Sequence, residues 1–315
     1  MPIPLYTQTV IAFIWDFDRT LIPSNQQDPL FAAYGVDPDE FWGEVDGLVD
    51  WYRARGEIVA RDQVYLLHIL SYVQAGVFDG LSNARLRELG AEIEPSPGIP
   101  EFFTATREHL ASVPEYAAQG ITVEHYVVST GIRPMIEGSV VAPHIDGIWA
   151  NTFVEGLAPR GYRDTLATAR ADTITHLGST IDNTAKTRAI FEINKGVNVH
   201  EGIDVNARMS EEQRRVPIPH MVYVADGPSD VPVFSILNQH GGKTLGVYTT
   251  EPRNNFRRVK DLQEQGRIQG LAEADFREGE AAYLWLMDSL DQIADEIVDA
   301  RRRAFASIPN PPGHV

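Results

Sequence analysis

The sequence predicts an α/β protein with a doubly wound parallel sheet and a helical segment inserted after the first strand. Three observations support this class. Short apolar runs that are typical of buried strands alternate with segments of helical periodicity. Two of these runs end directly in a pair of aspartates. A block of helical pattern separates the first run from all the others, and such a block does not extend the sheet.

The first predicted strand covers Val10–Trp15, a run of β-branched and aromatic residues. It leads directly into Asp16, and Asp18 and the hydroxyl of Thr20 follow at alternate positions. In an open α/β sheet, ligands bind outside the carboxyl ends of the strands. Two carboxylates crowded there repel each other unless a cation or a proton lies between them. Because Mg²⁺ is the natural cation for an all-oxygen site, this stretch predicts a metal-dependent nucleophile site.

A helical segment is predicted between this strand and the rest of the chain, over residues 23–96. Turn residues bound it, with Pro-Ser-Asn at 23–25 and Pro-Ser-Pro-Gly at 95–98. Within it, Asp37 is a candidate N-cap, and Pro38 suits the first position of the helix that follows. We expect this segment to form a cap over the strand ends. The predicted domains are therefore an α/β core of residues 1–22 and 97–315 and a helical cap of residues 23–96.

The chain after the predicted cap alternates between helix and strand. We expect strands over 121–128, 148–154, 221–225 and 243–248. We expect helices over 99–110, 132–141, 184–194 and 281–303, and one more that ends at Leu237. The last helix is amphipathic, and one of its faces carries Leu284, Met287, Leu290, Ile293 and Ile297. The polar segment 196–219 lacks periodicity and is predicted to be an insertion loop.

Composition narrows the classes of function. The 315 residues favour a core plus a second domain. The absence of cysteine excludes disulfides, thiolate metal sites and a cysteine nucleophile. A net charge of −17 argues against nucleic acid and anionic membranes as partners. No window reaches the roughly 20 apolar residues that span a bilayer. The N-terminus lacks the pattern of a signal peptide, so we expect a cytoplasmic protein.

Two further motifs offer a hydroxyl and a lysine as partners for the aspartates of the first motif. The strand over 121–128 is followed by Ser129, Thr130 and Gly131, and a hydroxyl beside a glycine at a strand end suits a phosphate oxygen. An ordinary turn is the alternative interpretation. Lysine occurs only at positions 186, 195, 243 and 260. Lys186, near the start of a predicted helix, is the candidate to neutralise a nucleophile and a phosphate. Lys195 is the second candidate, and its place at the helix end favours a surface role.

The strand over 221–225 also leads into two acids. Asp226 follows it directly, and Asp230 comes after a Gly-Pro-Ser turn. Asp226 is placed to complete a Mg²⁺ site with Asp16, because both follow predicted strands of the same sheet. Asp230 is expected either to hold a metal-bound water or to orient Lys186. An ordinary Asp-Gly turn is the alternative interpretation.

The order of these motifs resembles the haloacid dehalogenase-like (HAD) superfamily, and within it the phosphoserine-phosphatase-like members with a cap inserted after the first motif. The matching residues are Asp-Phe-Asp-Arg-Thr at 16–20, Ser-Thr-Gly at 129–131, Lys186, and Asp-Gly-Pro-Ser-Asp at 226–230. The chain departs from the family at Arg19 and Ala225, where the family usually has glycine. Segment 196–219 is also longer than the family's usual connection.

The resemblance implies a role for each motif residue. Asp16 would attack phosphorus and form an aspartyl-phosphate, and Asp18 would act first as general acid and then as general base. Mg²⁺ would be held by Asp16, by the backbone carbonyl of Asp18 and by Asp226, with Asp230 close by. The groups implied to bind or stabilise the phosphoryl group, together with one candidate for substrate contact, are Lys186, Thr20, Ser129, Thr130, Gly131 and Arg133.

The predicted function is therefore Mg²⁺-dependent hydrolysis of a phosphomonoester of a small metabolite. Two alternatives stay open at this stage. A phosphotransferase or phosphomutase would use the same motifs and differ only in the acceptor of the phosphoryl group. A HAD-like binding protein without activity is the non-enzymatic alternative. We expect the cap to choose the substrate, and its polar candidates are Arg53, Arg55, Glu57 and Arg61.

Overall fold

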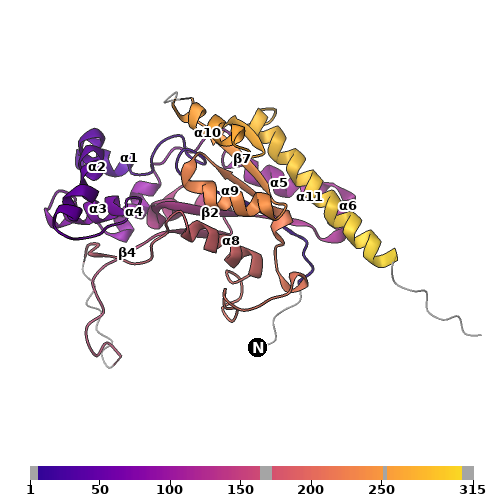
Figure 1. Cartoon of the computed structure of the whole chain (residues 1–315), viewed down its shortest axis with the longest axis horizontal. Helices are drawn as coiled ribbons and strands as arrows, with labels where there is room; N and C mark the ends of the chain where they lie inside the picture. Colours follow the sequence, from indigo (N-terminus) through magenta and orange to yellow (C-terminus); the bar gives the residue numbers. More distant parts are fainter. Residues whose placement is uncertain (1–5, 164–171, 251–253, 307–315) are drawn as a thin grey trace, which may run out of the picture.

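The computed structural model describes residues 6–163, 172–250 and 254–306, which form a six-stranded sheet and the helices around it (Figure 1). The strand order is β3-β2-β1-β6-β7-β8, and all neighbouring strands run parallel. Because the order reverses beside β1, the carboxyl ends of β1 and β6 open side by side at one edge of the sheet. The strands are β1 Val10–Trp15, β2 Thr122–Ile132, β3 Gly147–Asn151, β6 Met221–Ala225, β7 Lys243–Tyr248 and β8 Gly270–Glu273.

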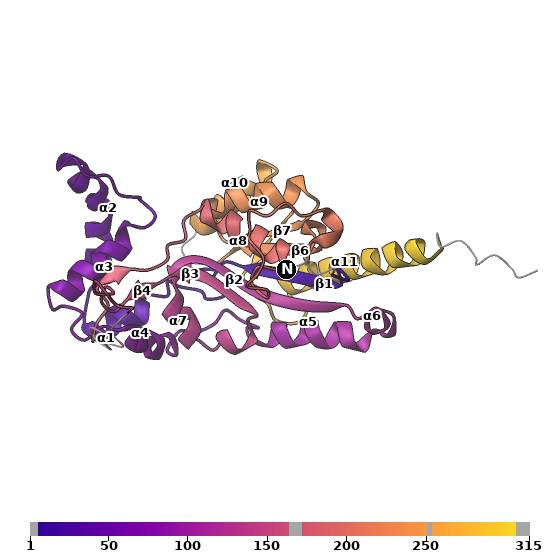
Figure 2. The same cartoon turned by 90° about the horizontal axis from the view of Figure 1, so that it is seen from below.

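Residues of β1 alternate between the two faces of this sheet. Ile11, Phe13 and Trp15 pack in one hydrophobic core, and Ala12 and Ile14 pack in the other. Figure 2 shows α8, α9 and α10 on one side of the sheet and α5 and α6 on the other. Burial of both faces confirms the predicted doubly wound parallel sheet. The helices around the sheet are α5 Glu101–Ser112, α6 Pro114–Gln119, α7 Arg133–Gly138, α8 Ala185–Lys195, α9 Val231–Gln239, α10 Asn254–Glu264 and α11 Ala281–Ala306.

Four helices follow β1 and gather at one end of the molecule (Figures 1 and 2). They are α1 Asp28–Tyr34, α2 Pro38–Ala54, α3 Val64–Gln74 and α4 Asn83–Gly90. The carboxylate of Asp37 accepts a hydrogen bond from the backbone of Asp39 at 2.8 Å, so it caps α2 as predicted. A Cβ on Gly90 would lie 2.1 Å from the carbonyl oxygen of Met135, so α4 and α7 cross with their backbones in contact. We call helices α1–α4 the helical segment.

Two strand predictions need correction. The expected strand over 148–154 is divided, because Thr152 leaves the main sheet and its N–H donates to the carbonyl of Ser179 at 2.9 Å. The next residues form β4 Phe153–Val154, which pairs antiparallel with β5 His176–Leu177. The strand expected over 121–128 continues as β2 to Ile132, with a shift of register after Val128. The Ser-Thr-Gly motif therefore lies in the irregular end of a strand rather than after it.

The helix predictions differ mainly at their ends. The helix expected over 132–141 stops at Gly138, and a short 3₁₀ turn, η1 Ala142–His144, follows it. Leu284 was expected on the buried face of the last helix, but it is 57% exposed; Leu290 and Ile293 on the same helix are buried. Segment 196–219 consists of turns with short 3₁₀ pieces. Within the described ranges, no helix combines the length and the apolar character needed to cross a bilayer.

Candidate active site

Three predicted aspartates converge at the carboxyl ends of β1 and β6. These strands are paired, and the N–H of Asp16 continues the ladder by donating to the carbonyl of Val224 at 2.9 Å. One carboxylate oxygen each from Asp16, Asp226 and Asp230 lies within 4.8 Å of the other two. All three side chains are buried. The parallel pairing of two strands that are distant in sequence thus builds the acidic cluster.

Lys186 completes this cluster from the first turn of α8. Its side chain is fully buried, and its Nζ lies 3.1 Å from Oδ1 of Asp16 and 2.6 Å from Oδ1 of Asp230. Burial by itself lowers the pKa of Lys186, but the charges of the two aspartates outweigh it and raise the pKa above its usual range. The two aspartates therefore favour the charged form of Lys186 beside Asp16. Lys195, the second candidate, instead donates to the backbone carbonyls of Val205 and Ala207 in segment 196–219.

Asp230 is held in place by three donors. Its Oδ1 accepts from Lys186 and from the hydroxyl of Tyr223, both at 2.6 Å, and its Oδ2 accepts from Ser229 at 2.8 Å. With these bonds made, Asp230 has little capacity left for a metal-bound water. Of its two expected roles, the geometry supports the one in which it orients Lys186.

Burial has the largest effect on the electrostatics of the cluster, and the neighbouring charges modify it. Burial raises the pKa of Asp16 well above its usual range; Lys186 opposes this effect, and the other aspartates add to it. Burial and the charge of Asp230 raise the pKa of Asp226 to about 6, against the opposing charges of Arg258 and Arg19. Buried carboxylates this close together need a cation between them to stay ionised.

The donor set fits Mg²⁺. The atoms available are carboxylate oxygens, which are the ligands that this hard cation prefers. Since Asp230 already accepts from three donors, Asp16 and Asp226 are the carboxylates best placed to hold the ion. The side chain of Asp18 is not a member of the cluster among the residues that the structure describes. A contribution of Asp18 through its backbone carbonyl stays a prediction.

The carboxylate of Asp18 is bound by Gln26. The backbone N–H of Gln26 donates to Oδ1 at 2.6 Å, and its side-chain Nε2 donates to Oδ2 at 3.0 Å. Burial raises the pKa of Asp18, and these two hydrogen bonds oppose that rise because they favour the ionised form. Gln26 was not among the predicted site residues. No sequence motif marks it, because its role depends on contacts that Gln26, just before α1, makes with Asp18 and with Ile132 at the end of β2.

The two departures from the family motif take different forms in the structure. Arg19 adopts φ 56°, a left-handed conformation that glycine adopts without cost. The backbone at this position therefore favours glycine over arginine. Ala225 is fully buried at the end of β6. The hydroxyl of Thr20 is buried and has no hydrogen-bond partner within the described part of the chain.

One internal hydrogen bond and two external ones hold the Ser-Thr-Gly motif. The N–H of Gly131 donates to Oγ of Ser129 at 2.9 Å. The carbonyl of Thr130 accepts from the hydroxyl of Tyr65 on α3 at 2.8 Å and from the side chain of Asn151 at the end of β3. Neither Tyr65 nor Asn151 was predicted at the site. Tyr65 ties the helical segment to the edge of the sheet that carries the acids.

Other predicted residues have partners of their own. Arg133 donates to Glu137 at 2.7 Å and to the carbonyl of Ile148 at 3.1 Å, and its contact with a substrate stays a prediction. Among the four polar candidates in the helical segment, Arg53 pairs with Asp50, and Arg55 lies 3.8 Å from Glu57. One cation that was not predicted reaches the cluster: Nη2 of Arg258 on α10 lies 3.7 Å from Asp226.

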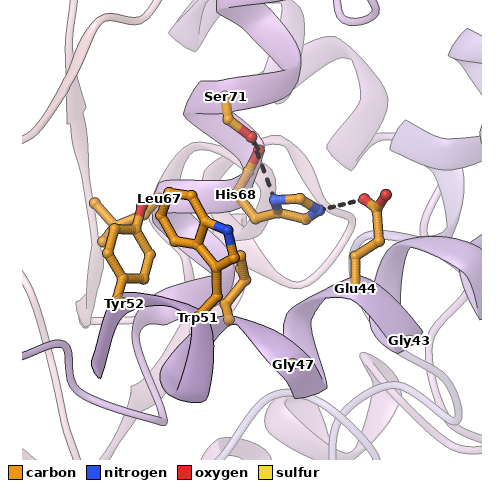
Figure 3. Close-up of a pocket in the computed structure, with 9 residues that line it drawn as sticks. Gly43, Glu44, Gly47, Trp51, Tyr52, Leu67, His68 and Ser71 are labelled. Atoms are coloured by element: carbon orange, nitrogen blue, oxygen red, sulfur yellow. Dashed lines mark hydrogen bonds and ion pairs between the residues drawn. The ribbon is translucent and has the colours of Figure 1, made fainter. Parts of the chain in front are cut away.

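A separate cavity of about 490 Å³ lies between α2 and α3 (Figure 3). Trp51, Tyr52 and Leu67 form apolar parts of its lining. At its polar end, Nε2 of His68 lies 2.6 Å from Glu44. This cavity contains none of the predicted catalytic or metal-binding residues, so it is distinct from the acidic cluster.

Comparison with known proteins gives one relative of high similarity. A protein of Borreliella burgdorferi, named only as an uncharacterized protein, is 37% identical over 289 residues, which cover 90% of this chain and 97% of the relative. No family model matches the chain.

Solved structures similar to this chain include HAD-family hydrolases and phosphoserine phosphatases. A structure described as a probable phosphoserine phosphatase from Vibrio cholerae is 12% identical, with a TM-score of 0.47 over 93% of this chain and 68% of that one. A HAD-family hydrolase from Salmonella enterica is 14% identical, with a TM-score of 0.43 over 78% of this chain and 64% of that one. At these scores the fold assignment rests on the strand order and the motif positions described above.

Proposed function

The chain belongs to one family with the Borreliella burgdorferi protein, and we propose that it is a HAD-type phosphomonoester hydrolase that requires Mg²⁺. One observation carries the proposal. Asp16, Lys186, Asp226 and Asp230 come from three distant parts of the sequence, and all four are buried together where β1 and β6 end. Phosphoryl transfer needs a nucleophile, a neighbouring cation and a carboxylate that can hold a metal ion, and these four residues supply candidates for each.

In the proposed reaction, a carboxylate oxygen of Asp16 attacks phosphorus, and the bond between phosphorus and the ester oxygen breaks. The leaving oxygen takes the electron pair of that bond and a proton from Asp18. Asp18, now ionised, then removes a proton from a water molecule that attacks the phosphorus of the aspartyl-phosphate. The bond to Asp16 breaks, and inorganic phosphate leaves.

The other residues of the site offset the negative charges of Asp16 and of the bound phosphate. Lys186 lies beside the oxygen of Asp16 and offsets the repulsion between that carboxylate and a phosphate dianion. Bound Mg²⁺ would supply further positive charge at Asp16 and Asp226. The unpartnered hydroxyl of Thr20 and the hydroxyl of Ser129 are proposed to donate to phosphoryl oxygens.

We also propose that the helical segment acts as a cap. The hydrogen bond from Tyr65 to Thr130 supports this role, since it places α3 at the edge of the sheet where the acids lie. A cap that covers the site would exclude water during the first step and would contact the leaving group, which makes it the source of substrate choice.

Release of phosphate from p-nitrophenyl phosphate tests the proposal, measured with Mg²⁺ and with EDTA. Wild-type protein should release phosphate only with Mg²⁺, and Asp16→Asn should lose this activity while keeping its circular dichroism spectrum. Asp46→Asn, an exposed change on α2, is the matched control and should behave as wild type. Activity of Asp16→Asn at the wild-type level would refute the nucleophile assignment.

Hydrolysis and transfer are distinguished by their products. With glycerol or a hexose added, a hydrolase should still yield free phosphate in an amount equal to the p-nitrophenol formed. A deficit of phosphate matched by a phosphorylated acceptor would instead identify a phosphotransferase.

A further inference from the structure

A single buried glutamine connects the proposed general acid to the second strand of the sheet. Gln26 lies just before α1 and is fully buried. Its Nε2 donates to Oδ2 of Asp18 at 3.0 Å, and its Oε1 accepts from the N–H of Ile132 at 2.8 Å. The side-chain amide therefore bridges the first motif and the end of the Ser-Thr-Gly motif.

The orientation of this amide is determined by its partners. If the amide turned over, its NH₂ group would face the N–H of Ile132, and its carbonyl oxygen would face the carboxylate of Asp18. Both contacts would be repulsive in a buried environment. The N–H of Ile132 therefore keeps the donor of Gln26 directed at Asp18. A glutamate of the same shape has no such donor in its ionised form, so glutamine is the residue that these partners require.

Gly131 provides the space for this bridge. A Cβ at position 131 would lie 1.6 Å from Nε2 of Gln26, which is impossible without displacing the amide. The backbone of Gly131 does not lie in the left-handed region, so its conformation alone does not call for glycine. The glycine of the motif is explained by the glutamine side chain that lies against it, and not by a turn.

We propose that Gln26 is a positioning residue that holds the carboxylate of Asp18 in the direction of the leaving group, and that Gly131 is required because Gln26 occupies the space beside it. This inference rests on the proposed function, since it assigns Gln26 a part in the same reaction. The backbone N–H of Gln26 also holds Oδ1 of Asp18, so loss of the side-chain bond should loosen the carboxylate without releasing it.

The first test compares two substrates that differ in their need for a general acid. The value of kcat/KM is measured for p-nitrophenyl phosphate, whose leaving group needs no proton, and for an alkyl phosphate, whose leaving group does. For Gln26→Leu we expect a loss of about 10-fold to 100-fold on the alkyl phosphate and of less than about 3-fold on p-nitrophenyl phosphate. Equal losses on both substrates, or no loss on either, would overturn the inference.

Gln27→Leu is the matched control. Gln27 is the neighbouring residue, is also buried, and makes none of the contacts that Gln26 makes to Asp18 and Ile132 among the described residues. It should leave the ratio of the two kcat/KM values unchanged. A change of that ratio as large as the one for Gln26→Leu would mean that general damage near α1 explains both results.

Gly131→Ala tests the second half of the inference. It should lower kcat/KM more on the alkyl phosphate than on p-nitrophenyl phosphate, because the added methyl group displaces the glutamine amide. The double variant Gln26→Leu/Gly131→Ala should lose no more than about 3-fold beyond the worse single variant, since both changes remove the same bridge. Losses that multiply would show that Gly131 acts independently of Gln26.

Crystal structures of the variants test the inference independently of activity. In crystals of Gln26→Leu and Gly131→Ala, the carboxylate of Asp18 should be rotated or present in more than one orientation. An unchanged, single orientation in both variants would overturn the inference whatever the kinetics. Failure of the proposed function would look different, because the wild-type protein would then hydrolyse neither phosphate ester with Mg²⁺.

Discussion

The Nζ of Lys186 lies 2.6 Å from Oδ1 of Asp230, and neither side chain is exposed to solvent. A buried ion pair of this kind stabilises little by itself, because both charges lose their hydration. Its consequence is positional: Asp230 directs the ammonium group to Asp16, 3.1 Å away. Two acids and one lysine thus form a unit in which each member depends on the others.

Lys186→Met should therefore damage both stability and turnover. It leaves two buried carboxylates without their cation, and we expect the free energy of unfolding to fall by about 3–5 kcal/mol. Phosphatase activity should fall about 100-fold or more at a temperature where circular dichroism shows the variant folded. Lys195→Met is the control, because Lys195 contacts only backbone carbonyls in the described structure. Greater loss of turnover in Lys195→Met would show that Lys186 is not the catalytic lysine.

Asp226 and Asp230 should respond differently to removal of their charge. Asp226→Asn removes a proposed Mg²⁺ ligand, so we expect the Kd for Mg²⁺ from calorimetry to rise by about 10-fold or more. Asp230→Asn weakens the hold on Lys186, and its main effect should be a lower melting temperature. A larger rise of the Mg²⁺ Kd in Asp230→Asn than in Asp226→Asn would reverse the assigned roles.

Arg19→Gly should stabilise the protein. The left-handed conformation at this position, φ 56°, costs an L-residue about 1–2 kcal/mol that glycine avoids. Part of the gain is offset because glycine is more flexible in the unfolded chain, so the expected net gain is about 0.5–1 kcal/mol. Arg19→Ala keeps the strain and serves as the control in thermal denaturation. Equal melting temperatures for the two variants would show that the backbone strain is unimportant.

Two histidines, the buried His125 and the half-buried His220, should make the fold sensitive to acid. Nδ1 of His125 accepts from Nε1 of Trp15 at 3.2 Å, and Nε2 lies 2.9 Å from the hydroxyl of Thr106, so protonation would break the first of these bonds. Burial lowers the pKa of His125 well below its usual range, and it lowers the pKa of His220 to about 4. Because unfolded histidine has a pKa of about 6.5, the unfolded state binds protons below that pH, whereas these two histidines stay neutral in the folded state.

The stability contributed by the neutral histidines is therefore complete above about pH 6.5 and is lost as the pH falls toward about 4. His220→Gln should reduce the loss over this interval by up to about 3 kcal/mol, measured by urea unfolding at both ends of it. An unchanged loss in this variant would mean that other groups account for the acid sensitivity.

The sequence by itself determined the strands that carry the acids. Val10–Trp15 and Met221–Ala225 were predicted with the bounds that they have in the structure, because each is a continuous run of apolar residues between polar segments. β8 was missed since it has only four residues, and α10 was missed since its pattern is mostly polar. The division between β3 and β4 was missed because it depends on pairing with β5 rather than on local composition.

The residues of the candidate site also fall into those that the sequence indicates and those that only the structure shows. Asp16, Asp18, Lys186 and Asp226 could be named as candidates because each follows a strand or begins a helix, and that local pattern is visible along the chain. Gln26, Tyr65 and Arg258 were missed because each reaches the site from a segment that carries no motif. Only the tertiary structure brings these residues to the site. Gln26 contacts Ile132, 106 positions away in the sequence. Such contacts follow from how strands and helices pack in space, which no local pattern encodes.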